Sequence, residues 1–310
     1  MRFKGLDLNL LIALDALLTE RNVSVAARKV FLSQSAMSGA LARLREHFGD
    51  ELLVPVGRKM VLTSAAELLA EPLRQLVLQI EATVGASLRF DPATSTRTFV
   101  VHASDYITEV VLNQVVPMVA QEAPGVVLEI VPPMSDPAAS LESGDVDLLI
   151  TPESYASGHH PTELLYEEQH VVVGWRENPA LAKPLTVDAF FSLGHVVTRF
   201  AAARAVAFSD TEIARMNRPR KIELVAPSFT SVPKLLIGTH RIGVMHQRLA
   251  QNYAHTLPLI VQPLPFAMSP LREVIQYHQV RAADAGVHWL KGLIHRAASA
   301  FTSVAMHRGN

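Results

Sequence analysis

The 310-residue sequence contains no cysteine. Disulfide bonds, thiolate nucleophiles, thiol redox sensing and cysteine-ligated zinc are therefore excluded. Long apolar runs are missing too, since no stretch approaches the roughly 18 apolar residues of a membrane-spanning helix. An excess of one charge sign is also absent: 28 Lys and Arg oppose 29 Asp and Glu, for a formal net charge of -1. The chain as a whole is thus not a basic nucleic-acid binder.

Targeting and catalytic signals are equally scarce. Asp7, Asn9 and Asp15 interrupt the first apolar segment, so we expect no secretory signal and a soluble, cytoplasmic protein. No GxSxG elbow, P-loop, GxGxxG or HExxH motif occurs, and we expect neither an enzyme nor a bound cofactor. Among 13 histidines, His159 and His160 are adjacent rather than at a ligand spacing. We therefore expect structural or surface histidines and no metal site.

What is present starts with residues 24–45, SVAARKVFLSQSAMSGALARLR, which predict two short helices joined by a tight turn. Ser24 and Ser33 are suitable N-caps for the first and second helix. In the second helix Met37 and Leu44 are separated by two turns, with Leu41 between them. This i, i+4, i+7 spacing predicts a buried stripe.

The opposite face of the second helix is polar, with basic side chains toward its end. In a recognition helix the first residues reach base edges, while basic groups hold phosphates. Residues 21–59 carry seven basic and three acidic side chains, a local excess that suits a phosphate-facing patch. Residues 52–63, LLVPVGRKMVLT, predict a hairpin with a basic tip, as in a winged helix-turn-helix. The predicted DNA contacts are Ser33, Gln34, Ser35, Ser38, Arg43, Arg45, Arg58 and Lys59. A helical hairpin with a solvated basic face and a simple surface hairpin are the alternatives.

A long helix is predicted from Ser64, which has capping-box spacing to Glu67. Apolar residues then recur at alternating spacings of four and three, a heptad seam. A single helix cannot bury so narrow a stripe alone, so we expect it to pair with a second copy. Pro72 lies inside the run and favours a kink. The predicted dimerisation residues are Leu69, Leu73, Leu76 and Ile80.

Beyond Thr98, short β-branched strands alternate with helices, which indicates α/β architecture with parallel sheets. A Pro/Gly/His-rich stretch at 152–161 separates two such sets, and the last strand and helix return to the first set. Two lobes with a cleft between them suit a small-ligand clamp. The predicted domains are 1–63 (winged helix-turn-helix), 64–90 (linker and dimerisation helix), 91–162 plus 270–310 (first lobe) and 163–269 (second lobe).

The cleft can be placed at the carboxyl ends of strands and at helix N-termini, where ligands gather in α/β lobes. The predicted effector-binding residues are Ser104, Asp105, Tyr106, Pro152, Glu153, Thr198, Phe200, Phe229 and Thr230. Each is also a possible helix cap or core residue, and Ser104 is expected to cap its helix in either case.

Four segments of the chain resemble the LysR-type transcriptional regulators. They are LDLNLLIALDALLTERNVSVAARKVFLSQSAMSGALARLRE, GDELLV with GRKMVLT, LESGDVDLLI, and SVPKLLIGTHRIGVMHQRLA. The opening RFKGLDLNLL resembles the branch that contains flavonoid-responsive root-nodulation regulators and activators of aromatic catabolism. The resemblance implies a winged helix-turn-helix, a long dimerising helix and a two-lobed regulatory domain like a periplasmic binding protein. It also implies homotetramers on promoter DNA, RNA polymerase as a partner, and a small effector in the cleft.

Two positions depart from the family pattern. The family commonly has proline where Ser35 stands and often arginine where Gly39 stands. A missing arginine removes one DNA contact, so the family's contact map cannot be transferred whole to this helix.

The resemblance and the candidate residues together predict a regulator, an activator, that responds to a small aromatic compound such as a phenol or flavonoid. Asp105 and Glu153, if they face the cleft, would repel a carboxylate and favour a phenol over an aromatic acid. Arg199 or Arg204 would reverse that preference if either faced inward. One rival is a small-molecule-binding α/β protein with a helical oligomerisation domain and no DNA role, which the basic excess at 21–59 disfavours. Another is a hydrolase or metalloenzyme, which lacks any motif.

Overall fold

The computed structural model describes residues 6–85, 90–132, 137–200 and 205–307. The chain divides into two compact units, Met1–Ser87 and Leu88–Asn310. In these four ranges no helix is both long enough and apolar enough to cross a membrane.

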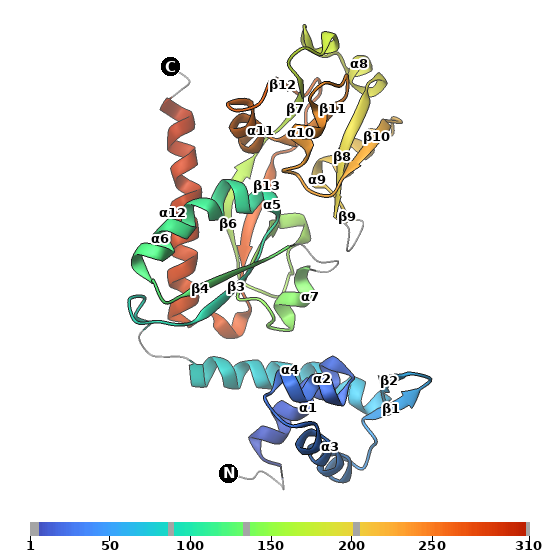
Figure 1. The fold of residues 1–310 in the computed structure, drawn as a ribbon, viewed down its shortest axis with the longest axis vertical. Coiled ribbons are helices and arrows are strands. Elements are labelled where there is room, and N and C mark those ends of the chain that lie inside the picture. The colour runs from blue at the N-terminus through green and yellow to red at the C-terminus, as the bar shows by residue number, and fades with distance from the viewer. Residues whose placement is uncertain (1–5, 86–89, 133–136, 201–204, 308–310) are drawn as a thin grey trace. The chain divides into compact units, whose positions relative to one another are not determined.

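The first unit has three short helices, a hairpin and a long helix (Figure 1). They are α1 (Leu8–Glu20), α2 (Val23–Lys29), α3 (Gln34–Phe48), β1 (Leu53–Val56), β2 (Lys59–Leu62) and α4 (Ser64–Gly85). The α3 cap is Ser33, as predicted, with its hydroxyl accepting the Ala36 N–H at 3.2 Å. The α2 cap is Asn22 rather than the predicted Ser24, because the Asn22 side chain accepts the N–H groups of residues 24 and 25.

The core of this unit forms where the apolar stripes of the helices meet. Leu14 and Leu17 of α1 and Met37 and Leu44 of α3 are almost completely buried, which confirms the predicted stripe of α3. Leu73 of α4 belongs to the same cluster. The cap of α4 is Thr63, whose hydroxyl accepts the Ala66 N–H at 3.2 Å, so the helix does not begin with the capping box predicted at Ser64.

The second unit contains two sheets (Figure 1). The first has the order β4-β3-β5-β13-β6, with β3 (Thr98–His102), β4 (Val127–Val131), β5 (Leu148–Pro152), β6 (Thr162–Glu168) and β13 (Leu271–Gln276). The second has the order β10-β8-β11-β7-β12, with β7 (His170–Trp175), β8 (Gly194–Phe200), β10 (Lys221–Ala226), β11 (Ile242–His246) and β12 (Leu259–Pro263), and short β9 (Ala205–Val206) pairs with β8. Parallel pairs lie beside antiparallel β6, β7, β12 and β13. The predicted α/β class is therefore confirmed, with mixed sheets.

Helices connect these strands. With the first sheet lie α5 (Asp105–Ile107), a π-helical turn (Thr108–Leu112), α6 (Asn113–Glu122), α7 (Pro137–Glu142) and α12 (Ala285–His307). With the second lie α8 (Val187–Ser192), α9 (Phe208–Ala214), α10 (Val232–Leu236) and α11 (Gln247–Ala254). The Ser104 hydroxyl accepts the Ile107 N–H at 3.2 Å, so Ser104 caps the α5 segment as expected.

The two sheets are joined by two crossovers. Only Gln169 separates β6 from β7, and residues 264–270 lead from β12 to β13. Because β6 pairs with β13, it belongs to the first sheet. The predicted lobe boundary before residue 163 therefore moves to Gln169. The sequence patterns predict neither β6 nor β12.

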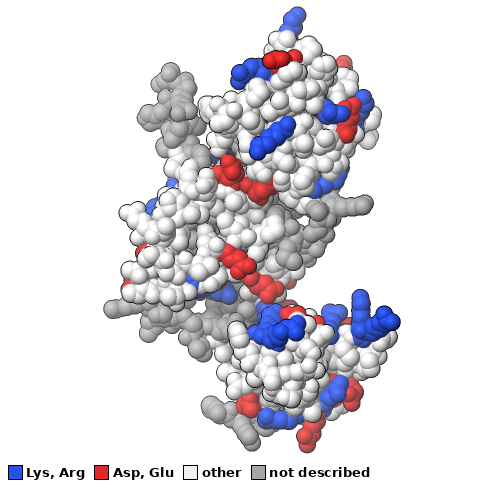
Figure 2. Space-filling model, in the orientation of Figure 1, with Lys and Arg blue, Asp and Glu red and all other residues white. Residues whose placement is uncertain are grey.

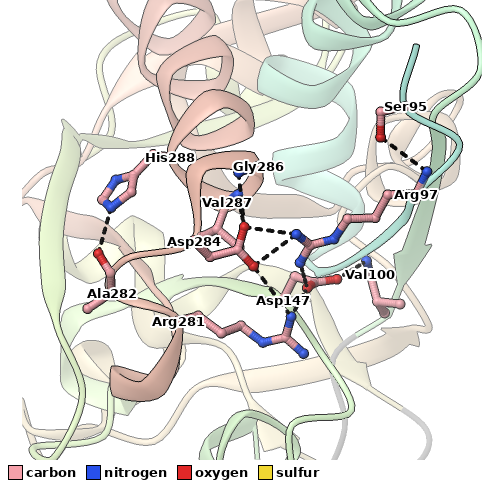
Figure 3. Close-up of polar contacts among 10 residues, drawn as sticks. All are labelled: Ser95, Arg97, Val100, Asp147, Arg281, Ala282, Asp284, Gly286, Val287 and His288. Carbon is pink, nitrogen blue, oxygen red and sulfur yellow. Dashed lines mark hydrogen bonds and ion pairs between the residues drawn. The ribbon is translucent and has the colours of Figure 1, made fainter. Parts of the chain in front are cut away.

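An ion network fastens the first sheet to the start of α12 (Figure 3). Asp147 Oδ1 accepts hydrogen bonds from Arg97 at 2.8 Å and from Arg281 at 2.6 Å, and its Oδ2 accepts the Val100 N–H at 2.8 Å. Arg97 also donates to Asp284, which precedes α12, at 2.8 Å. One carboxylate thus joins three separate segments of the chain.

Candidate functional site

The polar face of α3 is open in the first unit. Gln34, Ser35 and Ser38 are exposed, while Met37 between them is buried. The Ser33 hydroxyl is occupied as the α3 cap and lies 3.0 Å from that of Ser35. Gln34 and Ser38 therefore remain available for base edges at the helix start, where recognition helices make such contacts.

The two arginines at the end of α3 differ in environment. Arg43 is exposed, and its ion pair with Asp7 is long, with 3.5 Å between Nη2 and Oδ2. Arg45 is half-buried and donates to the Glu51 carbonyl at 2.8 Å and to the Leu53 carbonyl at 2.9 Å. Arg45 therefore holds the loop that leads into the hairpin, in addition to any phosphate contact.

The predicted hairpin is confirmed. Val56 pairs with Lys59, and Gly57 and Arg58 form a two-residue turn. Gly57 has φ +62°, and a two-residue turn of type II′ places glycine first because only glycine adopts that φ without strain. Arg58 and Lys59 are exposed at the tip, where Figure 2 shows basic side chains gathered.

The predicted dimerisation residues divide between two faces of α4. Leu73 is 8% exposed and Leu69 packs beside it against the core of the same unit. Leu76 is 46% exposed, and Leu68, which lies outside the predicted heptad seam, is 80% exposed. Leu69 and Leu73 thus cover the unit's own core, and an exposed row runs through Leu68, Pro72 and Leu76. The dimer contacts themselves stay a prediction. Ile80 is half-buried.

The second unit contains a cavity of about 440 Å³, within the range of roughly 300–1,000 Å³ for small-molecule sites. Both lobes contribute to it, and seven of its 18 described lining residues carry an aromatic or imidazole ring. Tyr106 stacks on His246 with ring centroids 3.8 Å apart. Phe229 meets His246 edge-on at 4.6 Å and Phe200 at 5.2 Å. The cavity therefore offers flat apolar surfaces to a ligand.

The predicted effector residues fall into two groups. Lining the cavity are Ser104, Tyr106, Pro152, Phe200 and Phe229. Asp105, Glu153, Thr198 and Thr230 are not part of its described lining. Asp105 instead accepts the Thr230 N–H at 2.7 Å, a bond between the lobes, Glu153 pairs with Arg272 at 2.7 Å on the surface, and Thr198 is buried in β8.

The lining also includes residues outside the predicted effector set. They include His102, Thr151, Tyr155, Phe208, Thr211, His246 and Glu273. His102 ends β3 and His246 ends β11, so the strand-end rule does point to these two positions. No Lys or Arg occurs in the described lining. Arg199 is not part of it, and Arg204 lies outside the described residues.

Burial controls the charge of the groups around the cavity. It lowers the pKa of His246 well below its usual value and that of neighbouring His170 to about 4, so both are neutral at pH 7. Burial raises the pKa of Glu168, which accepts the Tyr106 hydroxyl at 2.5 Å and pairs with Arg248 at 3.3 Å. The wall thus presents neutral rings, and the Glu168–Arg248 pair adjoins the lining residue Tyr106.

Comparison with known families agrees with this arrangement. Residues 8–67 match the bacterial regulatory helix-turn-helix protein, lysR family, and residues 93–299 match the LysR substrate binding domain. The chain belongs to the LysR family. It is a LysR-type DNA-binding transcriptional regulator, and the members of the family are regulators rather than enzymes.

Similar proteins cover almost the whole of this LysR regulator. It is 42% identical to nodulation protein D 2 of Rhizobium tropici over 98% of this chain and 96% of that protein. It is also 42% identical to nodulation protein D of Bradyrhizobium sp. (strain ANU 289), over 98% and 90% of the two chains. The predicted family and its nodulation-regulator branch are confirmed.

Solved structures support the same fold. The probable transcriptional regulator PA0477 from Pseudomonas aeruginosa superposes with a TM-score of 0.63 at 28% identity, covering 93% of this chain and 96% of that one. A full-length OxyR variant, also from Pseudomonas aeruginosa, superposes with a TM-score of 0.73 at 15% identity and covers 94% of each chain.

Proposed function

We propose that this LysR regulator is a transcriptional activator that responds to an uncharged aromatic compound, a phenol or flavonoid. The observation that carries the proposal is the aromatic-walled cavity, whose described lining has no cationic side chain for a carboxylate. Similarity to nodulation protein D supports it. The regulator would act in the cytoplasm on promoter DNA, with RNA polymerase as a partner and itself as a dimer or tetramer.

The effector class can be tested by calorimetric titration of the full-length protein with phenols, flavonoids, aromatic carboxylates, sugars and amino acids. We expect only the uncharged aromatic compounds to bind, because aromatic walls favour flat apolar ligands and a few polar groups orient them. Binding of sugars or amino acids alone would refute the proposed effector class and leave the DNA-binding assignment unaffected.

Within the DNA interface, we propose that Gln34 reads base edges and that Arg58 contacts phosphate. A side-chain amide pairs with adenine through two hydrogen bonds, at about 1–3 kcal/mol of discrimination. Gln34→Ala should therefore flatten affinity differences among operator variants. Arg58→Ala should weaken all sequences alike and reduce the salt slope by about one unit.

These effects can be measured by gel shifts with fragments that the purified protein retains from genomic DNA. Arg176→Ala in the second unit serves as a charge control and should change neither property. Unchanged relative affinities in Gln34→Ala would exclude base readout by this side chain.

Phe31 adds a contact that the sequence does not indicate. It lies in the turn between α2 and α3, with φ +56° and a side chain 98% exposed. Left-handed backbone costs a non-glycine residue roughly 1–2 kcal/mol. Because the ring is exposed, no hydrophobic burial offsets this cost in the free protein. We propose that the ring contacts DNA beside the recognition helix, against a sugar or a thymine methyl.

Phe31→Asn should therefore separate stability from binding. Asparagine tolerates the left-handed region, so the free energy of unfolding should stay equal or rise, while DNA affinity falls by about 1 kcal/mol. Chemical denaturation and gel shifts measure the two quantities. Val127→Thr, at an exposed apolar position of β4, is the control. Unchanged DNA affinity in Phe31→Asn would rule out the contact.

We also propose that α4 dimerises the protein through its exposed face. Leu68, Pro72 and Leu76 are exposed and follow one another at intervals of four residues, so they form one row along the helix surface. Apolar side chains in one exposed row favour association with a matching surface. A second copy of α4 supplies such a surface.

A further inference from the structure

One carboxyl group in the cavity wall has an unoccupied hydrogen-bonding position. Glu273 lies on β13, lines the cavity and is 2% exposed. Its Oε2 is buried and has no hydrogen-bond partner among the described residues. Such a group costs free energy unless something completes its hydrogen bonding, and the residue that carries it lines the cavity.

The strands around Glu273 explain why a carboxyl is tolerated there. In the β13–β6 register, Glu273 lies opposite Tyr166, and Leu271 lies opposite Glu168. Residues two apart on a strand share a face, so Glu168 and Glu273 lie diagonally across the pair on one side of the sheet. Two neighbouring carboxyl groups in a buried site do not both ionise readily.

Glu168 is the member of the pair whose hydrogen-bond donors stabilise a charge, while burial raises its pKa. Its oxygens accept the Tyr106 hydroxyl at 2.5 Å, the Gln169 N–H at 3.0 Å and Arg248 at 3.3 Å. Glu273 has no comparable set of donors among the described residues. Burial raises the pKa of Glu273 to about 8, and the charge of Glu168 acts in the same direction. Glu273 is therefore a protonated acid at pH 7.

The other groups around this part of the cavity are neutral or already paired. The titratable and charged ones are His102 on β3, Tyr106 on α5, Tyr155 after β5, Tyr166 and Glu168 on β6, His170 on β7, His246 at the end of β11 and Arg248 on α11. Burial lowers the pKa of His102 and, more strongly, of His246, and Arg248 pairs with Glu168 while its guanidinium lies 4.2 Å from the centre of the Tyr166 ring. A ligand at this position meets a neutral donor.

Given the proposed effector role of the cavity, on which this inference rests, we propose that Glu273 determines effector specificity. Its neutral carboxyl donates a hydrogen bond to a carbonyl oxygen on a flat, uncharged, fused-ring effector held between the aromatic walls. An effector carboxylate is disfavoured because no described lining side chain is cationic and Glu168 is ionised nearby. The chemical class selected is thus the uncharged aromatic ketone.

Flavone and flavan test this directly. Flavone has the ring carbonyl and no ionisable group. Flavan has a related three-ring skeleton that lacks the carbonyl and is saturated at the same ring, so the change with pH, rather than the affinity ratio alone, isolates the hydrogen bond. In calorimetry with the full-length protein at pH 6.5, flavone should bind about ten-fold more tightly than flavan, the value of roughly one hydrogen bond. At pH 9 only about one-tenth of Glu273 would stay protonated, so flavone affinity should fall about ten-fold and flavan affinity should not fall.

Two variants separate the hydrogen bond from packing. Glu273→Gln keeps an N–H donor that does not titrate, so it should bind flavone at both pH values. Glu273→Leu removes the donor and should bind flavone as weakly as flavan at both pH values. Thermal unfolding without ligand checks that each variant folds. If Glu273→Leu does not fold, the wild-type pH response and its loss in Glu273→Gln decide the question.

The outcomes distinguish this inference from the function on which it rests. Flavone binding that is equal at pH 6.5 and 9 and equal in Glu273→Leu would overturn the role of Glu273 and leave an aromatic-effector regulator in place. Failure of flavone, flavan and every phenol and flavonoid to bind the wild type would overturn the effector proposal itself, and the role of Glu273 with it.

Discussion

Asp147→Asn should lower the free energy of unfolding of the second unit by about 3–5 kcal/mol, the usual cost of breaking a buried ion pair from one side. The Asp147 side chain is 8% exposed and compensates Arg97 and Arg281, whose side chains are 27% and 19% exposed. Asparagine removes the charge. It also turns one of the two accepting oxygens into a donor, which would face either the guanidinium groups or the Val100 N–H.

Thermal unfolding measured by circular dichroism checks this expectation. Because about 1 kcal/mol shifts the midpoint by roughly 2–4 °C in a domain of this size, the midpoint of the second unit should fall by about 6–20 °C. Asp145→Asn is a matched control, since Asp145 is two residues away and exposed, and should shift it little. A midpoint in Asp147→Asn equal to that of the control would show that the network does not stabilise the unit.

Substitutions of buried and of exposed residues of α4 should have different consequences, the first for folding and the second for dimerisation. Leu73→Asp places a carboxylate among the buried side chains of the first unit, and the loss of packing and the desolvation together should cost about 3–5 kcal/mol. Leu68→Asp with Leu76→Asp changes only exposed positions. That double variant should stay folded and become monomeric, because repelling carboxylates would then face each other across the proposed pairing surface.

Sedimentation velocity and circular dichroism distinguish these results. The double variant should retain its helical signal and sediment more slowly than the wild type, whereas Leu73→Asp should lose the folded first unit. A double variant that sediments like the wild type would exclude the Leu68–Leu76 face as the pairing surface.

Local signals in the sequence are sufficient to predict most elements. Asp7 and Ser33 cap helices because a side-chain acceptor before an apolar run satisfies free N–H groups whatever the tertiary context. Strand β6 escapes prediction because it carries three glutamates in seven residues, and Tyr106 and Arg248, two of the partners of buried Glu168, are distant in sequence. Burial of a charged group is a tertiary property that composition does not reveal.

The dimer face and the cavity show the same limit. On α4, the core row Leu69–Leu73 and the outer row Leu68–Pro72–Leu76 both repeat every four residues, so periodicity cannot tell which one meets α1. In the cavity, the strand-end rule locates Ser104 and Phe200, which follow or end parallel strands. Glu273 lies within an antiparallel strand, a position to which the strand-end rule does not apply.

The Arg45 hydrogen bonds connect the recognition helix α3 to the hairpin. They join the last turns of α3 to the carbonyl groups of Glu51 in the following loop and of Leu53, and Leu53 is the first residue of the hairpin whose tip carries Arg58. These bonds therefore help to hold the hairpin tip at a set distance from the polar start of α3. If the proposed contacts of Gln34 and Arg58 both form, the duplex must present a groove and a stretch of backbone at that spacing, so DNA affinity would depend on groove width and twist as well as on the bases.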